Sequence, residues 1–132
     1  MGYARTKICT CSSVSVVIPA AFSSVCEKEF CTFRDGLAGA LNNLTKAQVF
    51  GISVDTFFAL KAWAVQQGFT FPLLSDFNRN VSKQYGILNE ERNIAVRTTY
   101  VLDKNGVIKS VEQGSVAIDP SGAKQMCSLL NH

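Results

Sequence analysis

Apolar and polar positions follow two different periods along this chain. Short apolar runs at 15–18, 48–54 and 98–102 are rich in β-branched residues, which predicts buried strands. Over 26–44 and 56–67, apolar residues recur three or four positions apart, as in helices that bury one face. The pattern therefore predicts strands alternating with helices through the first half of the chain.

Turn and capping residues mark the remaining elements. Asp103–Gly106 ends in Asn-Gly, which favours a tight hairpin turn, so 107–111 should return beside the preceding strand. We also expect a short extended segment at 71–74, a helix capped by Ser75-Asp76 that runs to Tyr85 before Gly86, and a final helix at 121–130. Alternation predicts parallel strands with right-handed crossovers, and the hairpin adds antiparallel strands. The expected fold is α/β, a mixed central sheet with helices on both faces.

Local positions within these helices can also be predicted. Ser23 and Ser24 are both suitable N-caps for the first helix. In the second helix, the spacing directs Leu60 inward, and with it Phe57, Ala64 and Trp63.

Length and charge restrict the classes of protein that fit. The chain has 132 residues, of which 47% are hydrophobic and 17% charged, so it can bury a core as one domain. Its net charge of +3 is not concentrated in a basic cluster, so nucleic-acid binding is not expected. No apolar run approaches the roughly 18 residues of a membrane span, so no membrane association is expected either.

The five cysteines, at 9, 11, 26, 31 and 127, argue for reduced thiols. An odd number cannot form a fully paired monomeric disulfide framework. The N-terminus carries two basic residues before an apolar stretch, but serines interrupt that stretch, which disfavours a signal peptide. We therefore expect a cytoplasmic protein whose clustered cysteines serve redox chemistry or metal binding.

Cys26 is the cysteine with the strongest chemical context. It falls in the first turn of the expected helix, directly after a strand, where free backbone N–H groups and the helix dipole stabilise a thiolate. Ser23 can place its hydroxyl beside the sulfur, and Pro19 fixes and shields the loop. The alternative is that Cys26 is a small buried hydrophobic residue at a helix start.

The arrangement of Pro19, Ser23 and Cys26 resembles the active-site motif P-x-x-x-[S/T]-x-x-C of the peroxiredoxins. The resemblance extends over roughly residues 14–112. The further segments that carry it are 26–35, 49–55, 71–76, Tyr85-Gly86-Ile87 and the strand that begins at Arg97.

This resemblance implies a thioredoxin-like fold and an enzyme without a cofactor. Residues 1–132 would form a single domain that is N-terminally short, lacking the family's usual N-terminal hairpin. The implied function is a thiol-dependent peroxidase that reduces hydrogen peroxide and alkyl hydroperoxides. Its partner would be a thioredoxin-like or other thiol reductant. Separately, the loss of edge strands would expose a sheet edge and apolar surface, which favours homo-oligomers through the sheet edge or the active-site face.

The resemblance also implies roles for individual residues. Cys26 would attack the peroxide as a thiolate and become a sulfenic acid. Arg97 would supply a fixed positive charge, and the Ser23 hydroxyl would hold the peroxide in line. The backbone N–H groups of Val25 and Cys26 would complete the donor set. Glu29 would orient Arg97, or else be a solvated helix residue.

Cys31 follows Cys26 by five positions. On one helix the two sulfurs cannot meet, because the rise alone exceeds about 7 Å. The C-x4-C spacing nevertheless resembles the bacterioferritin comigratory class of peroxiredoxins, which implies a Cys26–Cys31 disulfide after local unwinding. The alternative is an inert core cysteine.

The remaining candidates carry weaker expectations. Cys127 is expected to pack in the last helix, and His132 to be a solvated chain end. Cys9 and Cys11 could bind metal or form a strained disulfide, although no second ligand pair flanks them and we expect no metal site. Two other functions stay open: a non-catalytic thioredoxin-fold module for redox sensing or interaction, and a metal-binding protein that uses Cys9 and Cys11.

Overall fold

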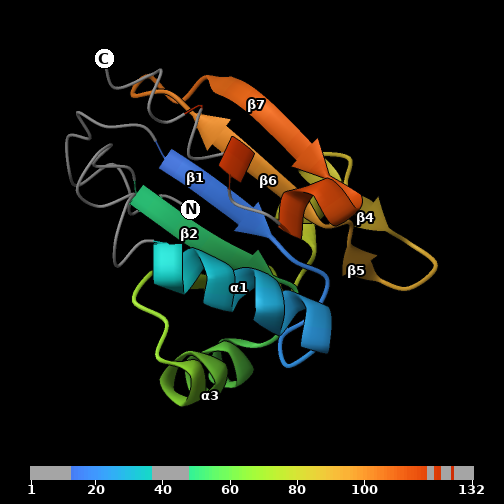
Figure 1. The fold of residues 1–132 in the computed structure, drawn as a ribbon. Coiled ribbons are helices and arrows are strands. Elements are labelled where there is room, and N and C mark those ends of the chain that lie inside the picture. Colours follow the sequence, from blue (N-terminus) through green and yellow to red (C-terminus); the bar gives the residue numbers. More distant parts are fainter. Residues whose placement is uncertain (1–12, 37–47, 119–120, 123–125, 127–132) are drawn as a thin grey trace.

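The computed structural model describes residues 13–36, 48–118, 121–122 and 126. Two sheets and four helices make up this part of the chain (Figure 1). In chain order the elements are β1 (Ser13–Val17), α1 (Ser24–Gly36), β2 (Gln48–Ser53), α3 (Phe57–Gln67), β3 (Leu73–Ser75), α4 (Asn80–Gln84), β4 (Leu88–Asn89), β5 (Ile94–Ala95), β6 (Thr98–Leu102), β7 (Ile108–Gln113) and the 3-10 helix η3 (Gly114–Ile118).

A mixed five-stranded sheet forms the centre of the molecule, in the order β3-β2-β1-β6-β7. β1 is the middle strand, pairing parallel with β2 and antiparallel with β6. β3 extends the parallel side, and β7 closes the hairpin with β6. The mixed sheet expected from the sequence is therefore confirmed.

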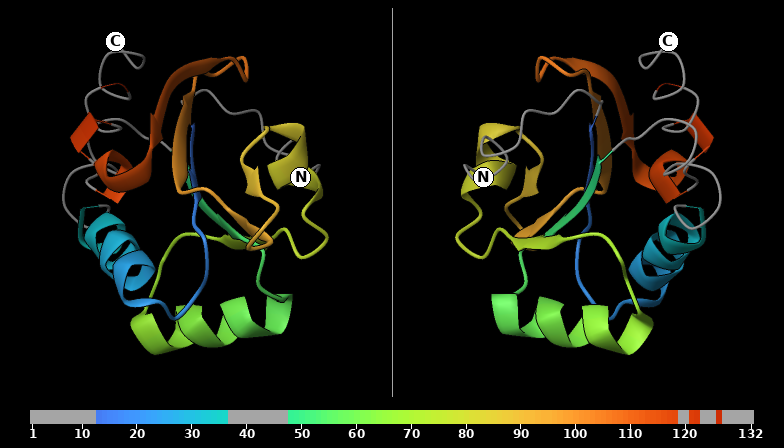
Figure 2. Two further views of the ribbon diagram at one scale, coloured as in Figure 1. Left: turned by 90° about the vertical axis from the view of Figure 1, so that its right-hand side faces the viewer. Right: turned by 90° about the vertical axis from the view of Figure 1, so that its left-hand side faces the viewer.

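Helices lie on both faces of this sheet (Figure 2). α1 and η3 cover one face, while α4 and the small β4–β5 hairpin lie on the other. Successive side chains of β1 point to opposite faces, so Val16 and Ile18 pack toward α1 whereas Val17 packs toward Ile87 and Tyr100. Both sides of β1 are thus buried, which holds the end of this strand, and the loop after it, in a fixed place.

An aromatic cluster anchors α1 to the sheet and to α3. Phe30 is fully buried, stacks on Trp63 at 5.2 Å between ring centroids, and meets Phe69 and Phe71 edge-on. Its ring lies over Gly51 of β2, where an added Cβ would come within 2.6 Å of it. Only glycine leaves room for Phe30 at this point of the sheet.

Most of the expected elements are confirmed by the structure. The strands expected at 15–18, 48–54 and 98–102 are present, as are the helices that begin near residues 24 and 57. The hairpin turn is held by the carboxylate of Asp103, which accepts from the N–H groups of Asn105 and Val107. Ser24 is the first residue of α1, which places Ser23 at the N-cap.

One local expectation is wrong, and two elements are present but shifted along the chain. Phe57 was expected to face inward but is 61% exposed, because residues 57–59 at the start of α3 contribute no buried side chain and Leu60 and Trp63 form the buried face instead. The helix expected from Asp76 begins only at Asn80, since Asp76 accepts from Val81 and Ser82 N–H groups across a turn. The extended segment is shifted to Leu73–Ser75, where it pairs with β2.

Some expectations fall on residues outside the described part. The helical pattern is described as far as Gly36, and 37–47 lie outside. Of the final helix only residues 121, 122 and 126 are described, with Met126 packed against the main core cluster.

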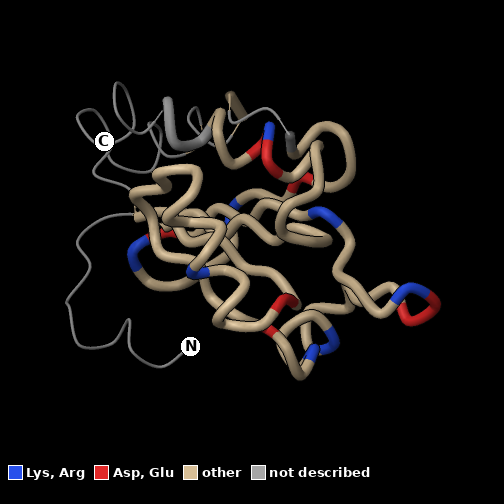
Figure 3. Tube along the Cα trace, turned by 90° about the horizontal axis from the view of Figure 1, so that it is seen from below, with Lys and Arg blue, Asp and Glu red and all other residues tan. Residues whose placement is uncertain are grey.

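None of the described helices has the length and hydrophobicity to cross a membrane. Lysines, arginines and carboxylates are interspersed along the described trace (Figure 3).

Candidate active site

Cys26 sits where the loop after β1 turns into α1. The first helical hydrogen bond runs from the Glu27 N–H to the Ser23 carbonyl, at 2.8 Å. The N–H groups of Val25 and Cys26 precede that bond and belong to the end of the helix that carries partial positive charge. The Cys26 side chain is only 1% exposed, so the sulfur is shielded from solvent at this helix end.

Arg97 reaches the same sulfur from the opposite side. It directly precedes β6, and the antiparallel register pairs Thr98 with Val17, which brings Arg97 beside the loop that follows β1. Its Nη2 donates to Cys26 Sγ at 3.2 Å, while Nη1 forms an ion pair with Glu29 Oε2. One guanidinium therefore bridges a sulfur and a carboxylate that lie three residues apart on one face of α1.

Glu29 is a buried residue, and the alternative that it is solvated is wrong. Its side chain has no exposed surface, and Oε1 has no hydrogen-bond partner in the described part of the chain. Burial raises the pKa of Glu29 to about 7, against the lowering effect of the Arg97 charge and hydrogen bond. Burial acts to lower the pKa of Arg97, but the hydrogen bond to Cys26 and the charge of Glu29 outweigh it and raise that pKa.

Ser23 and Pro19 lie in the loop, as the motif requires, and both are half-buried. The Ser23 hydroxyl donates to the Ala20 carbonyl at 3.1 Å, which uses its single proton and leaves its oxygen to accept. Val25 is 45% exposed, so its side chain lies on the open side of the helix start. The structure thus joins Cys26, Glu29 and Arg97 by direct contacts, and Ser23 lies three residues before Cys26 at the start of the same helix.

Cys31 does not lie with these residues. α1 runs unbroken through both cysteines, and both are free thiols. The half-buried Cys31 thiol is directed to the other side, toward Gln67 at the end of α3, with 3.7 Å between Sγ and Oε1.

One residue that the sequence reasoning missed is Asp55. Its carboxylate accepts from the Ala21 N–H at 2.6 Å and from the Ser53 hydroxyl, and its carbonyl accepts from the Ser75 hydroxyl. These bonds tie the active-site loop to the ends of β2 and β3. A signal was present in the sequence: Asp55 follows a buried strand, and parallel neighbouring strands end at the same edge of a sheet.

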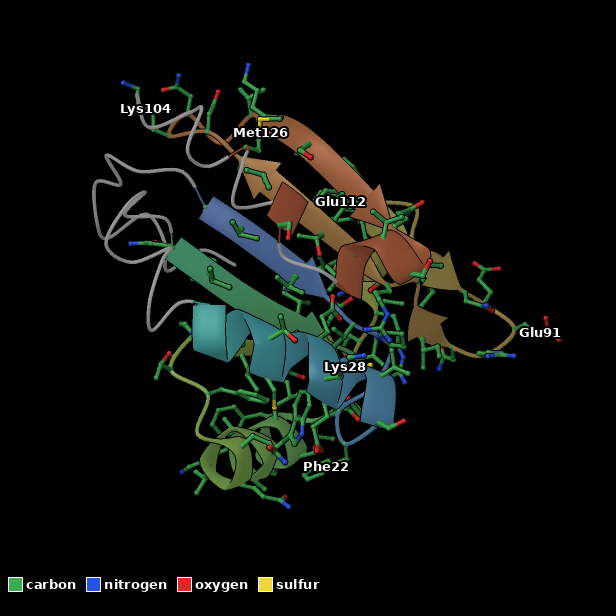
Figure 4. The ribbon with its side chains drawn as sticks, in the orientation of Figure 1. Phe22, Lys28, Glu91, Lys104, Glu112 and Met126 are labelled. Atoms are coloured by element: carbon green, nitrogen blue, oxygen red, sulfur yellow. The ribbon has the colours of Figure 1, made fainter. Side chains whose placement is uncertain are left out.

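Phe22 supports the loop from the side of α3 (Figure 4). Its φ of 63° is unusual for a residue other than glycine, and its ring lies 6.0 Å from that of Trp63. The loop therefore has two attachments, a hydrogen bond at Ala21 and an aromatic contact at Phe22.

Metal ligands do not gather in the described part of the chain. Within it, no group of three or more histidine, cysteine or acidic side chains is arranged to hold an ion. Cys9, Cys11, Cys127 and His132 lie outside the described residues, so the expectations for them stay open.

Comparison with known proteins identifies the class to which this site belongs. Residues 12–111 match the AhpC/TSA family. Alkyl hydroperoxide reductase E of Mycobacterium tuberculosis is 43% identical over 99 residues, which cover 74% of this chain and 63% of that relative. The crystal structure of the peroxidoxin BcpB from the same organism superposes with a TM-score of 0.79 at 30% identity, covering 92% of this chain and 80% of the other.

The chain belongs to the AhpC/TSA family, and the resemblance to the peroxiredoxins is confirmed. The thioredoxin-like fold is confirmed as well, since the bacterioferritin comigratory protein of Xanthomonas campestris superposes with a TM-score of 0.81 at 18% identity, covering 93% of this chain and 82% of the other. The chain spans less than two thirds of the length of this alkyl hydroperoxide reductase E.

Proposed function

We propose that this chain is a thiol-dependent peroxidase that reduces hydrogen peroxide and alkyl hydroperoxides. The observation that carries the proposal is the sulfur of Cys26, buried at the start of α1 and 3.2 Å from Arg97 Nη2. A fixed cation and the end of a helix both favour a thiolate over a thiol. The membership of the AhpC/TSA family supports the same activity.

The proposed reaction uses the groups around Cys26. The thiolate attacks the terminal peroxide oxygen, the S–O bond forms as the O–O bond breaks, and the electron pair leaves with the alkoxide or hydroxide. Arg97 stabilises the negative charge as it moves from sulfur to the leaving oxygen. The Ser23 oxygen accepts a hydrogen bond from the peroxide, and the N–H groups of Val25 and Cys26 donate to it. The products are a Cys26 sulfenic acid and, after protonation, an alcohol or water.

The second half of the proposed cycle uses Cys31. Its thiolate attacks the sulfenic sulfur as the S–O bond breaks, the leaving hydroxide takes up a proton from solvent to become water, and a Cys26–Cys31 disulfide forms. Because both residues lie on one continuous helix, α1 must unwind between them first. Glu29 and Phe30 lie in that stretch and are fully buried, so unwinding must break the ion pair with Arg97 and withdraw Phe30 from the aromatic cluster.

The proposed partners follow from this chemistry. A thioredoxin-like or other small dithiol reductant would restore the two thiols, which suits the cytoplasm as a reducing compartment. We also propose that the chain forms homo-oligomers. The exposed apolar residues of β7, Ile108 and Val111, support the edge of the sheet as one contact surface.

The test is the intact mass after one equivalent of hydrogen peroxide, on the reduced wild type and on the Cys26→Ser and Cys31→Ser variants. We expect the wild type to lose two hydrogens within seconds, with the disulfide mapped to Cys26 and Cys31. Cys31→Ser should instead gain one oxygen at Cys26, and Cys26→Ser should not react. A wild-type protein that stays unmodified for minutes would be a non-catalytic relative. A disulfide between Cys26 and a cysteine other than Cys31 would exclude Cys31 as the resolving residue.

A further inference from the structure

Arg97 is shared between two acidic groups. Its guanidinium donates through Nη2 to Cys26 Sγ and through Nη1 to Glu29 Oε2, and it is only 11% exposed. If the thiol and the carboxyl were both ionised, two negative charges would face one positive charge in a site that excludes water. A buried excess charge is costly, so one of the two acids must keep its proton.

Glu29 is the acid on which that proton is stabilised. Both side chains are buried, but the sulfur of Cys26 has the additional support of the helix N-terminus, which stabilises a negative charge there. The pKa of Glu29, raised by burial to about 7, places its titration in the neutral range. Arg97 is the one charged group in the described residues whose charge shifts the titration of Glu29, and the same guanidinium donates to Cys26 Sγ.

We propose that Glu29 is the proton store of the site: it is protonated while Cys26 is a thiolate, and it ionises when Cys26 becomes a neutral sulfenic acid. This inference rests on the proposed peroxidase function. Oxidation removes the negative charge on sulfur, so Arg97 is left with Glu29 as its only anionic partner in the described part of the chain. The negative charge that faces Arg97 is then on the Glu29 carboxylate and no longer on the sulfur.

The proton balance of the reaction then closes within the site. A thiolate, a protonated carboxyl and a hydroperoxide give a sulfenic acid, a carboxylate and an alcohol, with a net charge of minus one on each side. The proton that Glu29 loses equals the proton that the leaving alkoxide gains. Wild-type protein should therefore take up no net proton from solvent below pH 7, whereas a variant without the Glu29 carboxyl should take up one.

The first test is an infrared difference spectrum between reduced and peroxide-treated Cys31→Ser protein, which stops at the sulfenic acid. We expect a protonated carboxyl band to disappear and a carboxylate band to appear, and the same spectrum from Cys31→Ser/Glu29→Gln to lack both. Proton uptake, followed with a pH indicator in weak buffer at pH 6.5, should be near zero per sulfur oxidised in Cys31→Ser and near one in the double variant. Equal uptake by the two proteins would overturn the proposal.

A second variant tests the same coupling without any turnover. Cys26→Ser removes the competing anion, so Arg97 should act on Glu29 alone. The pKa of Glu29 should therefore fall, as measured by the infrared titration of its carboxyl band. An unchanged titration would contradict the proposal even if Glu29→Gln failed to fold. The control is the peroxide reaction of Cys31→Ser itself: if Cys26 is not oxidised there, the proposed function fails, and if it is oxidised without a carboxyl change, only the proton store fails.

Discussion

The two cysteines of α1 lie five residues apart on one helix, in contrasting surroundings. Cys26 is buried in the first turn and receives a hydrogen bond from a guanidinium. Cys31 is half-buried in the middle of the helix, and its neighbour is the neutral side chain of Gln67, 3.7 Å away. The first position favours charge on sulfur, and the second provides only packing and a weak contact.

In the proposed cycle, the difference between the two positions would separate the reaction with peroxide from the formation of the disulfide. The residues between the cysteines include Glu29 and Phe30, each buried and each tied to another element. The same contacts that hold Cys26 in its reactive geometry therefore hold Cys31 away from it. If Cys31 resolves Cys26 as proposed, the stability of the helix between them would govern how long a sulfenic acid at Cys26 persists.

The largest effect should follow from removing the cation at Cys26. In Arg97→Met, the rate of reaction with hydrogen peroxide should fall by about 10²-fold or more, the usual cost of losing one donor to a developing charge. The readout is stopped-flow fluorescence of Trp63, the single tryptophan, which lies against the active-site loop through Phe22. Arg92→Met, at an exposed position, is the matched control. A rate within threefold of wild type would remove Arg97 from the mechanism.

Glu29 should make the stability of the folded protein depend on pH. Its pKa rises from 4.5 in the unfolded chain to about 7 in the folded protein, so the folded state holds the proton more tightly. The stabilisation is complete below pH 4.5 and is lost as the pH rises through 7, an amount on the order of 3 kcal/mol. The free energy of unfolding in urea should be measured across this pH range for the wild type and for Glu29→Gln. The difference between the two proteins should fall as the pH rises, whereas Glu91→Gln, an exposed control, should keep the pH dependence of the wild type. Parallel curves for wild type and Glu29→Gln would contradict the assignment.

The packing beneath Phe30 gives the next effect in size. Gly51→Ala would place a methyl group 2.6 Å from the Phe30 ring and from Leu73, so we expect a loss of about 1–3 kcal/mol in the free energy of unfolding. Because Phe30 anchors the turn between the cysteines, disulfide formation should also become faster relative to sulfenic acid formation. Gly68→Ala, with nothing within 4 Å, is the comparison and should affect stability alone. Slower disulfide formation in Gly51→Ala would show that the packing of Phe30 does not limit the unwinding of α1.

The sequence was sufficient to predict those parts of the fold that depend on local patterns. Strand β6 was predicted with its observed bounds, because a run of β-branched residues before an Asn-Gly turn has a single good interpretation. Phe57 was misplaced because helical periodicity cannot tell whether the first turn of a helix lies over the sheet or beyond its edge. The start of α4 was misplaced because Asp76 caps a turn from a distance, with its carboxylate reaching Ser82.

The site was predictable by a different route. The motif of Pro19, Ser23 and Cys26, joined with Arg97, came from the resemblance to the peroxiredoxins, and the antiparallel register of β1 and β6 explains why residues so distant in sequence meet. The burial of Glu29 could not be read from the helix, where it is flanked by exposed Lys28 and buried Phe30. The place of Asp55 at the end of a buried strand was visible in the sequence, but the contact between its carboxylate and the Ala21 N–H of another loop was not.

The smallest effect should come from the surroundings of Cys31. In Gln67→Ala, the free energy of unfolding should change by less than about 1 kcal/mol, because a sulfur–oxygen contact of 3.7 Å contributes little, and the rate at which Cys26 reacts with peroxide should not change. The thiol of Cys31 should become more accessible, so its alkylation by iodoacetamide should be faster than in Gln66→Ala, which alters the exposed neighbour. A change in the rate at which Cys26 reacts with peroxide would show that the surroundings of Cys31 affect Cys26. It would contradict the proposal that the two cysteines act in separate steps.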